Sequence, residues 1–257
     1  MNAAASRHPA IPITRSEAQS LEITAWDRIA PSRVRDLDLG RDPSFRFVLS
    51  PGVSTLVPQT AISVLDIGCG VGRFTQELAR PDRKVVAIDP SPVSAALSKQ
   101  HLRAFANIEV LNQTVREYGS DRYAIHDAGV ALMVLQDITD LDDFLRNAAK
   151  VLRRNASFVG AITHPRHWPQ YWGYDKAPWF EYDKEFFIRS IFRTSLTETD
   201  IATLHVHRPI RMYRTAFHNA GFTNIESWEP LMDVRAQRIA GVSWTRPHFW
   251  FFRAIRK

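Results

Sequence analysis

From residue 63 onward the chain alternates short β-branched or apolar runs with longer segments of helical spacing, and this order constrains the fold more than any other feature. Strand followed by helix, repeated along a chain, predicts a parallel sheet with helices on both faces. Apolar runs such as 85–88 suit strands that are buried on both sides. We expect strands at Ser63–Ile67, Lys84–Ile88, Ile108–Leu111, 129–135 and 157–162, with helices at 72–79, 92–103 and 141–152.

The segments on either side of this alternation are expected to elaborate one domain. Residues 1–60, punctuated by prolines, are predicted to form an N-terminal helical extension and lid. Residues 61–257 are the expected sheet domain, with an aromatic-rich insertion at 165–205 after the fifth strand. Pro209 and Gly221 then fit the start and the C-terminal cap of a further helix, and strand-like runs at 222–228 and 248–255 close the chain.

The cysteine content indicates the cellular compartment, and the charge indicates which kinds of partner are possible. The single cysteine, Cys69, excludes an internal disulfide and fits a reducing compartment, and no apolar run reaches the roughly 18 residues that span a membrane. The first 20 residues lack the apolar stretch of a secretory signal, so we expect a cytoplasmic protein, either monomer or homodimer. The net charge of +6 would attract polyanions, but the 33 Lys and Arg residues are scattered, so no nucleic-acid partner is expected.

The sequence DIGCGVG at 66–72 follows a predicted strand and leads into a predicted helix. Glycines at such a bend let the backbone approach a ligand closely, because a side chain there would block it. Asp89 ends the next strand, 21 residues beyond Gly68, which matches an acidic residue that binds ribose hydroxyls. A nicotinamide-binding turn is the alternative, but its third glycine position falls on Arg73.

At these residues the sequence resembles the class I S-adenosylmethionine-dependent methyltransferases, whose first motif reads V-L-D-x-G-C-G-x-G much as residues 64–72 do. The resemblance covers residues 61–152 well and the later strand and helix pattern acceptably. It implies a Rossmann-like α/β fold with a seven-stranded, mostly parallel sheet whose last strand is antiparallel. It also implies S-adenosylmethionine as the cofactor, with its methionine moiety and ribose contacted by Asp66, Gly68, Cys69, Gly70, Gly72, Asp89 and Pro90.

The resemblance also implies contacts elsewhere in the chain. Residues 132–137, at the end of the fourth strand and including Met133, are expected to border the sulfonium and the methyl group. Thr114 and Val115 follow the third strand, where the family often has an acidic residue facing adenine, so this contact departs from the pattern. Trp26 and Arg46 are candidates for a lid, in which Arg46 pairs with the cofactor's carboxylate. The alternatives are helix packing by Trp26 and a solvated Arg46.

The aromatic segment after the fifth strand is expected to form the substrate side of the site, since ligands of open α/β sheets bind beyond the carboxyl ends of the strands. Aromatic rings there would wall an organic substrate, or else form a small satellite core beneath the insertion. The candidate substrate-binding residues are Trp168, Tyr171, Trp172, Tyr174 and Trp179.

Three histidines are candidates for a catalytic base, which methyl transfer needs only when the acceptor must lose a proton. His164, at the mouth of the fifth strand, comes first, followed by His205 and His207, which share one face of an extended segment. The alternative for each is a hydrogen-bonded or partly exposed histidine without a catalytic role. Since no cysteine or carboxylate accompanies them at known ligand spacing, we expect no metal.

Together these features predict a transferase that moves a methyl group from S-adenosylmethionine to an O, N or C nucleophile of a small-molecule metabolite. The stretch 132–137 lacks the Asn/Asp-Pro-Pro-aromatic signature of enzymes that methylate amino groups of DNA bases. An RNA or protein methyltransferase, suggested by the net positive charge, is one alternative. A non-catalytic S-adenosylmethionine-binding scaffold protein, suggested by the altered Thr114 region, is another.

Overall fold

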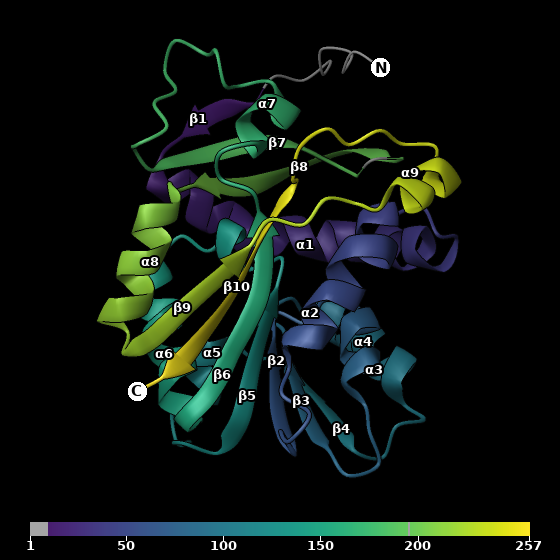
Figure 1. Ribbon diagram of the computed structural model, residues 1–257, viewed down its shortest axis with the longest axis vertical. Coiled ribbons are helices and arrows are strands. Elements are labelled where there is room, and N and C mark those ends of the chain that lie inside the picture. Colours follow the sequence, from purple (N-terminus) through teal and green to yellow (C-terminus); the bar gives the residue numbers. More distant parts are fainter. Residues whose placement is uncertain (1–9, 195) are drawn as a thin grey trace.

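The computed structural model describes residues 10–194 and 196–257, so the first nine residues of the extension expected over residues 1–60 lie outside the described residues. The main feature is a seven-stranded sheet (Figure 1). The first five strands from one edge run parallel, whereas β10 is antiparallel to both neighbours, which confirms the predicted Rossmann-like sheet. The order is β4 (Ile108–Leu111), β3 (Lys84–Ile88), β2 (Ser63–Ile67), β5 (His126–Leu132), β6 (Leu152–Thr163), β10 (Phe249–Arg256) and β9 (Phe222–Trp228).

Helices cover both faces of this sheet, as predicted (Figure 1). Successive residues of a strand point to opposite faces. In β2, Leu65 therefore packs in a core cluster with side chains of α6 and α8, while the preceding Val64 packs in a second cluster with α2 and α3. These helices, with the two others of the sheet domain, are α2 (Ser50–Leu56), α3 (Arg73–Leu78), α4 (Pro92–Leu102), α5 (Val115–Tyr118), α6 (Leu141–Val151) and α8 (Ile210–Asn219).

Two predicted strand boundaries shift where the backbone leaves the regular pattern. The strand expected at 129–135 is β5, which ends at Leu132 because Met133 has a left-handed φ of 60°. A short 3₁₀ turn, η2 (Leu135–Asp137), follows it. The strand expected at 157–162 is the second half of β6, which starts directly where α6 ends. The remaining strands of the main sheet begin and end within one residue of their predicted bounds.

The N-terminal region contains helices, as expected, and also a strand that the sequence did not reveal. α1 (Arg15–Asp38) begins at a capping box, in which Thr14 and Glu17 each accept a backbone N–H from the other. The π-helical turn η1 (Phe45–Leu49) leads directly into α2. Ahead of α1, β1 (Ile11–Ile13) pairs with a strand from the insertion.

The aromatic-rich insertion forms a second sheet, which the sequence did not predict. After α7 (Trp168–Trp172), β7 (Phe186–Arg193) and β8 (Glu198–His207) form an antiparallel hairpin. β1 pairs with the other edge of β7, giving the order β1-β7-β8. Because α1 packs against β8, the N-terminal helix and the insertion form one unit, which we call the cap: α1, α7 and this three-stranded sheet.

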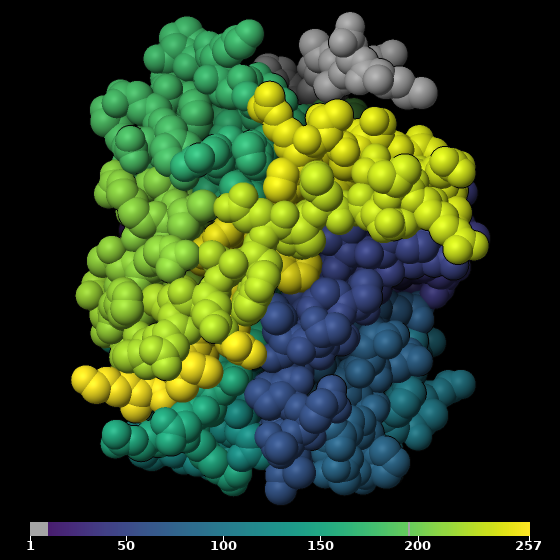
Figure 2. Space-filling view, in the orientation of Figure 1, coloured from purple at the N-terminus to yellow at the C-terminus, as the bar shows by residue number. Residues whose placement is uncertain are grey.

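The cap occupies one end of the molecule, above the main sheet in Figure 1. Figure 2 shows the insertion beside the segment that carries α9 (Val234–Ala240) at the same end. Among the described residues, no helix has both the length and the apolar content to cross a bilayer.

Candidate active site

A cavity of about 280 Å³ lies between the main sheet and the cap. Its sheet side is formed by residues at the carboxyl ends of β2, β3, β5 and β6, including the glycine loop, Asp89, Met133 and Thr163. Its other side comes from α1, η1, α7, β7, β8 and the residues where β10 begins. This is the edge at which open α/β sheets bind ligands.

The glycine loop contributes backbone to the cavity, and two of its three glycines line it. Gly68 and Gly70 have φ values of 73° and 55°, in the left-handed region that favours glycine. A Cβ added to Gly68 would lie 2.6 Å from Cγ2 of Val134, so there is no room for a side chain at this position. A Cβ added to Gly70 would meet no heavy atom within 4 Å. Gly70 therefore borders open space, where a ligand can approach the backbone.

Two buried carboxylates, Asp66 and Asp89, lie beside this loop. Asp89 accepts hydrogen bonds from the backbone N–H groups of Gly70 at 2.8 Å and Ser91 at 2.9 Å. Asp66 accepts one from the Thr75 hydroxyl at 2.6 Å. Burial raises the pKa of Asp66 to about 7 and the pKa of Asp89 to about 6, because an ionised carboxylate loses its hydration there. A ligand that brings hydrogen-bond donors into the cavity would favour the ionised forms.

Eight of the residues predicted to contact a cofactor line this cavity. They come from α1, from the glycine loop and from the carboxyl ends of β3 and β5. These residues are Trp26, Asp66, Gly68, Cys69, Gly70, Asp89, Pro90 and Met133.

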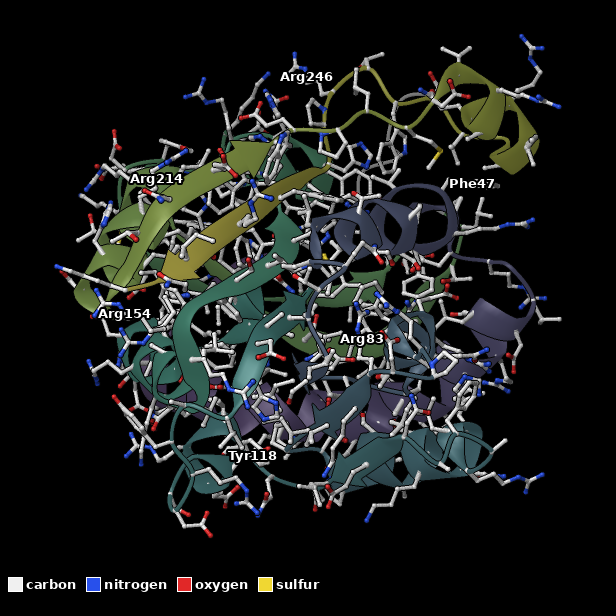
Figure 3. All side chains as sticks on the ribbon, turned by 60° about the horizontal axis from the view of Figure 1, so that its bottom comes forward. Phe47, Arg83, Tyr118, Arg154, Arg214 and Arg246 are labelled. Atoms are coloured by element: carbon white, nitrogen blue, oxygen red, sulfur yellow. The ribbon has the colours of Figure 1, made fainter. Side chains whose placement is uncertain are left out.

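The other four predicted cofactor residues do not line the cavity. Thr114 is the N-cap of α5, and Val115 is the first residue of that helix, buried in the core. Gly72 precedes α3 as its N-cap. The guanidinium of Arg46 lies 5.0 Å from the centroid of the Phe47 ring, and Phe47 is labelled in Figure 3.

A different arginine, Arg33 of α1, lines the cavity. Its Nη2 donates a hydrogen bond to Asp42 at 2.8 Å, while its buried Nη1 has no hydrogen-bond partner among the described residues. Arg33 could not be distinguished from Arg28 or Arg35 on the same helix by sequence alone. Which of them faces the cavity depends on how α1 is rotated about its axis where it packs.

The aromatic residues predicted to bind substrate divide into two groups. Trp168, Tyr171 and Trp172 line the cavity, and the i to i+4 spacing of the tryptophans puts both on one face of α7, with ring centroids 5.6 Å apart. Tyr174 and Trp179 stack on each other at 5.7 Å and pack behind this wall without lining the cavity. The insertion thus supplies both a cavity wall and a small core.

Of the three candidate bases, His205 lines the cavity. It lies on β8, is buried, and its ring makes no hydrogen bond to the described residues. The ring of Trp172 meets it edge to face, with centroids 5.2 Å apart. Burial lowers the pKa of His205 well below its ordinary value, so the imidazole is neutral near pH 7. His207 lies outside the lining, where its Nε2 is 2.9 Å from the carbonyl oxygen of Tyr182.

His164 also lies outside the cavity lining, in a cluster with His167 and Glu229. Its Nδ1 accepts the backbone N–H of Arg166 at 3.1 Å, and its buried Nε2 is 3.4 Å from Oε1 of Glu229. Burial lowers the pKa of His164, and the negative charge of Glu229 acts in the opposite direction. The three side chains bring ligand-type atoms within 4.8 Å of one another. Sequence spacing did not reveal this proximity because Glu229 follows β9, far along the chain.

Two features of this cluster argue against its binding a cation. With Nδ1 as an acceptor, the proton of neutral His164 sits on Nε2 and faces Glu229, whereas a metal requires a lone pair there. The positive charges of Arg166 and Arg246 lie near enough to lower the pKa of His167, after the larger effect of burial. Arg246, labelled in Figure 3, comes from the segment before β10. We therefore describe the cluster as a pairing of His164 with Glu229 at 3.4 Å, beside His167.

Three further carboxylates line the cavity: Asp137, from the stretch 132–137 expected to border the methyl group, and Glu22 and Asp42, which were not among the predicted site residues. Asp137 is buried in η2, and its Oδ2 accepts a hydrogen bond from Nε2 of Gln136 at 3.0 Å. Burial raises the pKa of Asp137 well above its ordinary value. Its place just beyond a central parallel strand was a usable signal in the sequence. Glu22 carried no such signal, because only the docking of α1 brings it to the cavity.

Comparisons with known proteins identify relatives of this chain. Residues 65–160 match a family described as a methyltransferase domain. The ubiquinone biosynthesis O-methyltransferase of Bradyrhizobium diazoefficiens is 30% identical over 180 residues, which cover 66% of this chain and 70% of that relative. The protein of the same name from Methylobacterium sp. strain 4-46 is 28% identical over 161 residues, covering 56% of this chain and 59% of that relative. The chain thus spans between 59% and 70% of the length of these two relatives.

A solved structure shares the fold. An S-adenosylmethionine-dependent methyltransferase from Listeria monocytogenes superposes with a TM-score of 0.61 at 20% identity, over 80% of this chain and 96% of that chain. This likeness agrees with the sheet order and with the position of the glycine loop. The chain belongs to the class I S-adenosylmethionine-dependent methyltransferases.

Proposed function

We propose that this protein transfers a methyl group from S-adenosylmethionine to a hydroxyl oxygen of a small aromatic molecule. The observation that carries the proposal is that one cavity is lined both by the glycine loop with Asp89 and by the tryptophans of α7 with His205. Two reactants held in one cavity react as neighbours, because binding has already met the entropic cost of bringing them together. The relatives' name, ubiquinone biosynthesis O-methyltransferase, supports an oxygen acceptor, and the aromatic wall supports a flat ring.

The residues around the glycine loop fit this cofactor. Gly70 leaves backbone open to a ligand, and each oxygen of Asp89 accepts one hydrogen bond, which leaves lone pairs for ribose hydroxyls. The buried, unpartnered Nη1 of Arg33 would donate to the carboxylate of the methionine moiety. When bound, the cofactor supplies an electrophilic methyl carbon attached to a sulfonium.

His205 is the residue we assign to the acceptor's proton. A hydroxyl that donates to the neutral imidazole can pass its proton to that ring as its oxygen becomes the nucleophile. Because burial lowers the pKa of His205, the ring is neutral near pH 7 and offers a lone pair to that hydroxyl. Trp168 and Trp172 would hold a planar acceptor beside it and exclude water.

The position of the cavity beneath the cap favours a small acceptor over a macromolecular one. Its volume of about 280 Å³ must also admit the cofactor, which favours a compact organic molecule as the acceptor. An RNA strand would need an open groove with basic side chains along its backbone. We therefore infer a small-molecule acceptor and interpret the net charge of +6 as a solvated surface.

Two measurements test this proposal. Titration calorimetry of the wild-type protein should show binding of S-adenosylhomocysteine, and absence of binding would refute the cofactor assignment. Incubation with S-adenosylmethionine and a panel of dihydroxybenzenes, followed by mass spectrometry, should show the mass of one added CH₂ unit on the acceptor. Anilines of matched shape serve as the control, and methylation of the anilines alone would contradict an oxygen acceptor.

A further inference from the structure

The loop that follows β5 forms a central part of the cavity wall. It turns sharply at Met133, whose φ of 60° is strained for a residue with a side chain, and continues through η2. The residues of this loop that line the cavity are Met133, Val134, Gln136, Asp137 and Ile138. A loop of this kind lacks the repeated hydrogen bonds of a sheet, so other groups must fix its position.

One such group is Arg208, which follows β8 and is 2% exposed. Its Nη2 donates to the carbonyl oxygens of Ile138 at 2.8 Å and Thr139 at 3.3 Å, and its Nη1 donates to that of Leu135 at 3.4 Å. Its Nε donates to Oε1 of Glu185 at 2.5 Å, which neutralises the buried charge. The planar guanidinium thus satisfies three carbonyls of one loop at once, which a lysine ammonium cannot do from the same position.

A second group comes from α1. Oε2 of Glu22 accepts hydrogen bonds from the hydroxyl of Thr139 at 2.6 Å and from its backbone N–H at 3.3 Å. Arg208 and Glu22 therefore hold the end of the same loop, the first through its carbonyls and the second through its donors. Glu22 belongs to α1 and Arg208 directly follows β8, so both come from the cap. The loop instead connects elements of the main sheet domain.

We propose that Arg208 is a positioning residue: with Glu22, it holds the loop at 133–139 so that Gln136 and Asp137 face the reacting groups. The inference rests on the proposed function, because it treats the cavity as the place of methyl transfer. A merely structural salt bridge would affect the stability of the whole protein. A positioning residue affects this loop and the turnover number, while the cofactor end of the cavity stays intact.

The main test is the substitution Arg208→Lys, which keeps the positive charge and removes the planar set of N–H donors of the guanidinium. We expect hydrogen–deuterium exchange of the peptide covering 133–139 to accelerate by about tenfold or more, while peptides of β2 and β3 exchange as in the wild type. For the acceptor identified above, we expect kcat to fall on the order of 100-fold with little change in the affinity for S-adenosylhomocysteine, since a misplacement of about 1 Å has that effect.

Matched variants separate positioning from general stability. Arg211→Lys changes an exposed arginine that pairs with Asp183 and should leave both the exchange and kcat unchanged. Glu22 is tested in the same way. Glu22→Ala should accelerate exchange of the loop, whereas Glu22→Gln should keep it slow, because the amide oxygen of glutamine can accept both hydrogen bonds from Thr139.

The outcomes distinguish this inference from the function on which it rests. Unchanged exchange of the loop in Arg208→Lys, or an equal acceleration in every peptide, would overturn the positioning role. Failure of the wild type to bind S-adenosylhomocysteine would instead overturn the proposed function, and the exchange measurements, which use no ligand, would still decide the role of Arg208.

Discussion

At the scale of single residues, the cavity depends on carboxylates that are kept out of water. Burial raises the pKa of Asp66 to about 7, above the ordinary value of 3.8. Between these two values the folded state holds a proton that the unfolded chain releases, so the stability contributed by Asp66 decreases as the pH rises. A change of pH therefore changes the ionisation of a carboxyl group that lies beside the glycine loop.

The substitution Asp66→Asn tests this linkage. Asparagine still accepts the Thr75 hydroxyl but does not titrate. As the pH rises from about 4 to about 8, we expect the wild type to lose stability relative to the variant by up to about 4 kcal/mol. Urea unfolding of both proteins at each pH, without ligand, measures the difference. Parallel pH profiles would show that Asp66 does not titrate in this window.

The substitution His205→Gln tests the proton acceptor. Glutamine is similar in size and polar, but it does not take a proton, so kcat should fall by about 100-fold to 10,000-fold. The affinity for S-adenosylhomocysteine should stay close to that of the wild type. His218→Gln, at an exposed position near the end of α8, is the control. Wild-type turnover by His205→Gln would remove His205 from the mechanism.

At the scale of elements, the main sheet was predictable and the small sheet was not. The central strands β2, β3 and β5 are short, mostly apolar runs, so their identity is encoded locally. The strand β1 has three residues and acquires its structure only by pairing with β7, where Ile11 lies opposite Arg189. No local pattern encodes a pairing between residues so far apart in the chain. In β7, three phenylalanines obscured the alternation that marks a strand.

The short helix α7 gives a prediction at this scale. Trp172 is 7% exposed, and Trp172→Ala should destabilise the protein by about 3–5 kcal/mol, because it removes a large buried side chain. The same change should raise the KM for the acceptor, since the cavity wall beside His205 is lost. Trp228→Ala, at a site that is 40% exposed, is the matched control in urea unfolding and kinetics. An unchanged KM would mean that the acceptor does not contact α7.

At the scale of the whole molecule, some residues that line the cavity could be predicted from the sequence and others could not. The glycine loop and Asp89 were predictable because their spacing follows from the chemistry of binding a nucleoside. Arg33 and Glu22 were not, because their place depends on how α1 docks onto β8. Asp137 stands between these cases: its position in the chain was visible, but its burial was not.

Ligand binding should therefore slow hydrogen–deuterium exchange on both sides of the cavity. S-adenosylhomocysteine at about 100 times its Kd should stabilise the protein by about 2.7 kcal/mol. We expect slower hydrogen–deuterium exchange in the glycine loop and also in α1, which lines the opposite side. Protection confined to the glycine loop would contradict a closed site beneath the cap. The exposed α9 is the internal reference and should exchange at the same rate with and without ligand.

The pairing of β1 with β7 has a consequence for how ligands enter and leave. A helix anchored only at its C-terminal end would swing aside as a free arm, but α1 is also tied at its N-terminal end by the bonds of Ile11–Ile13 to β7. Any movement of α1 that carries Glu22 and Arg33 away from the cavity must therefore either take the three-stranded sheet with it or break the pairing of β1 with β7.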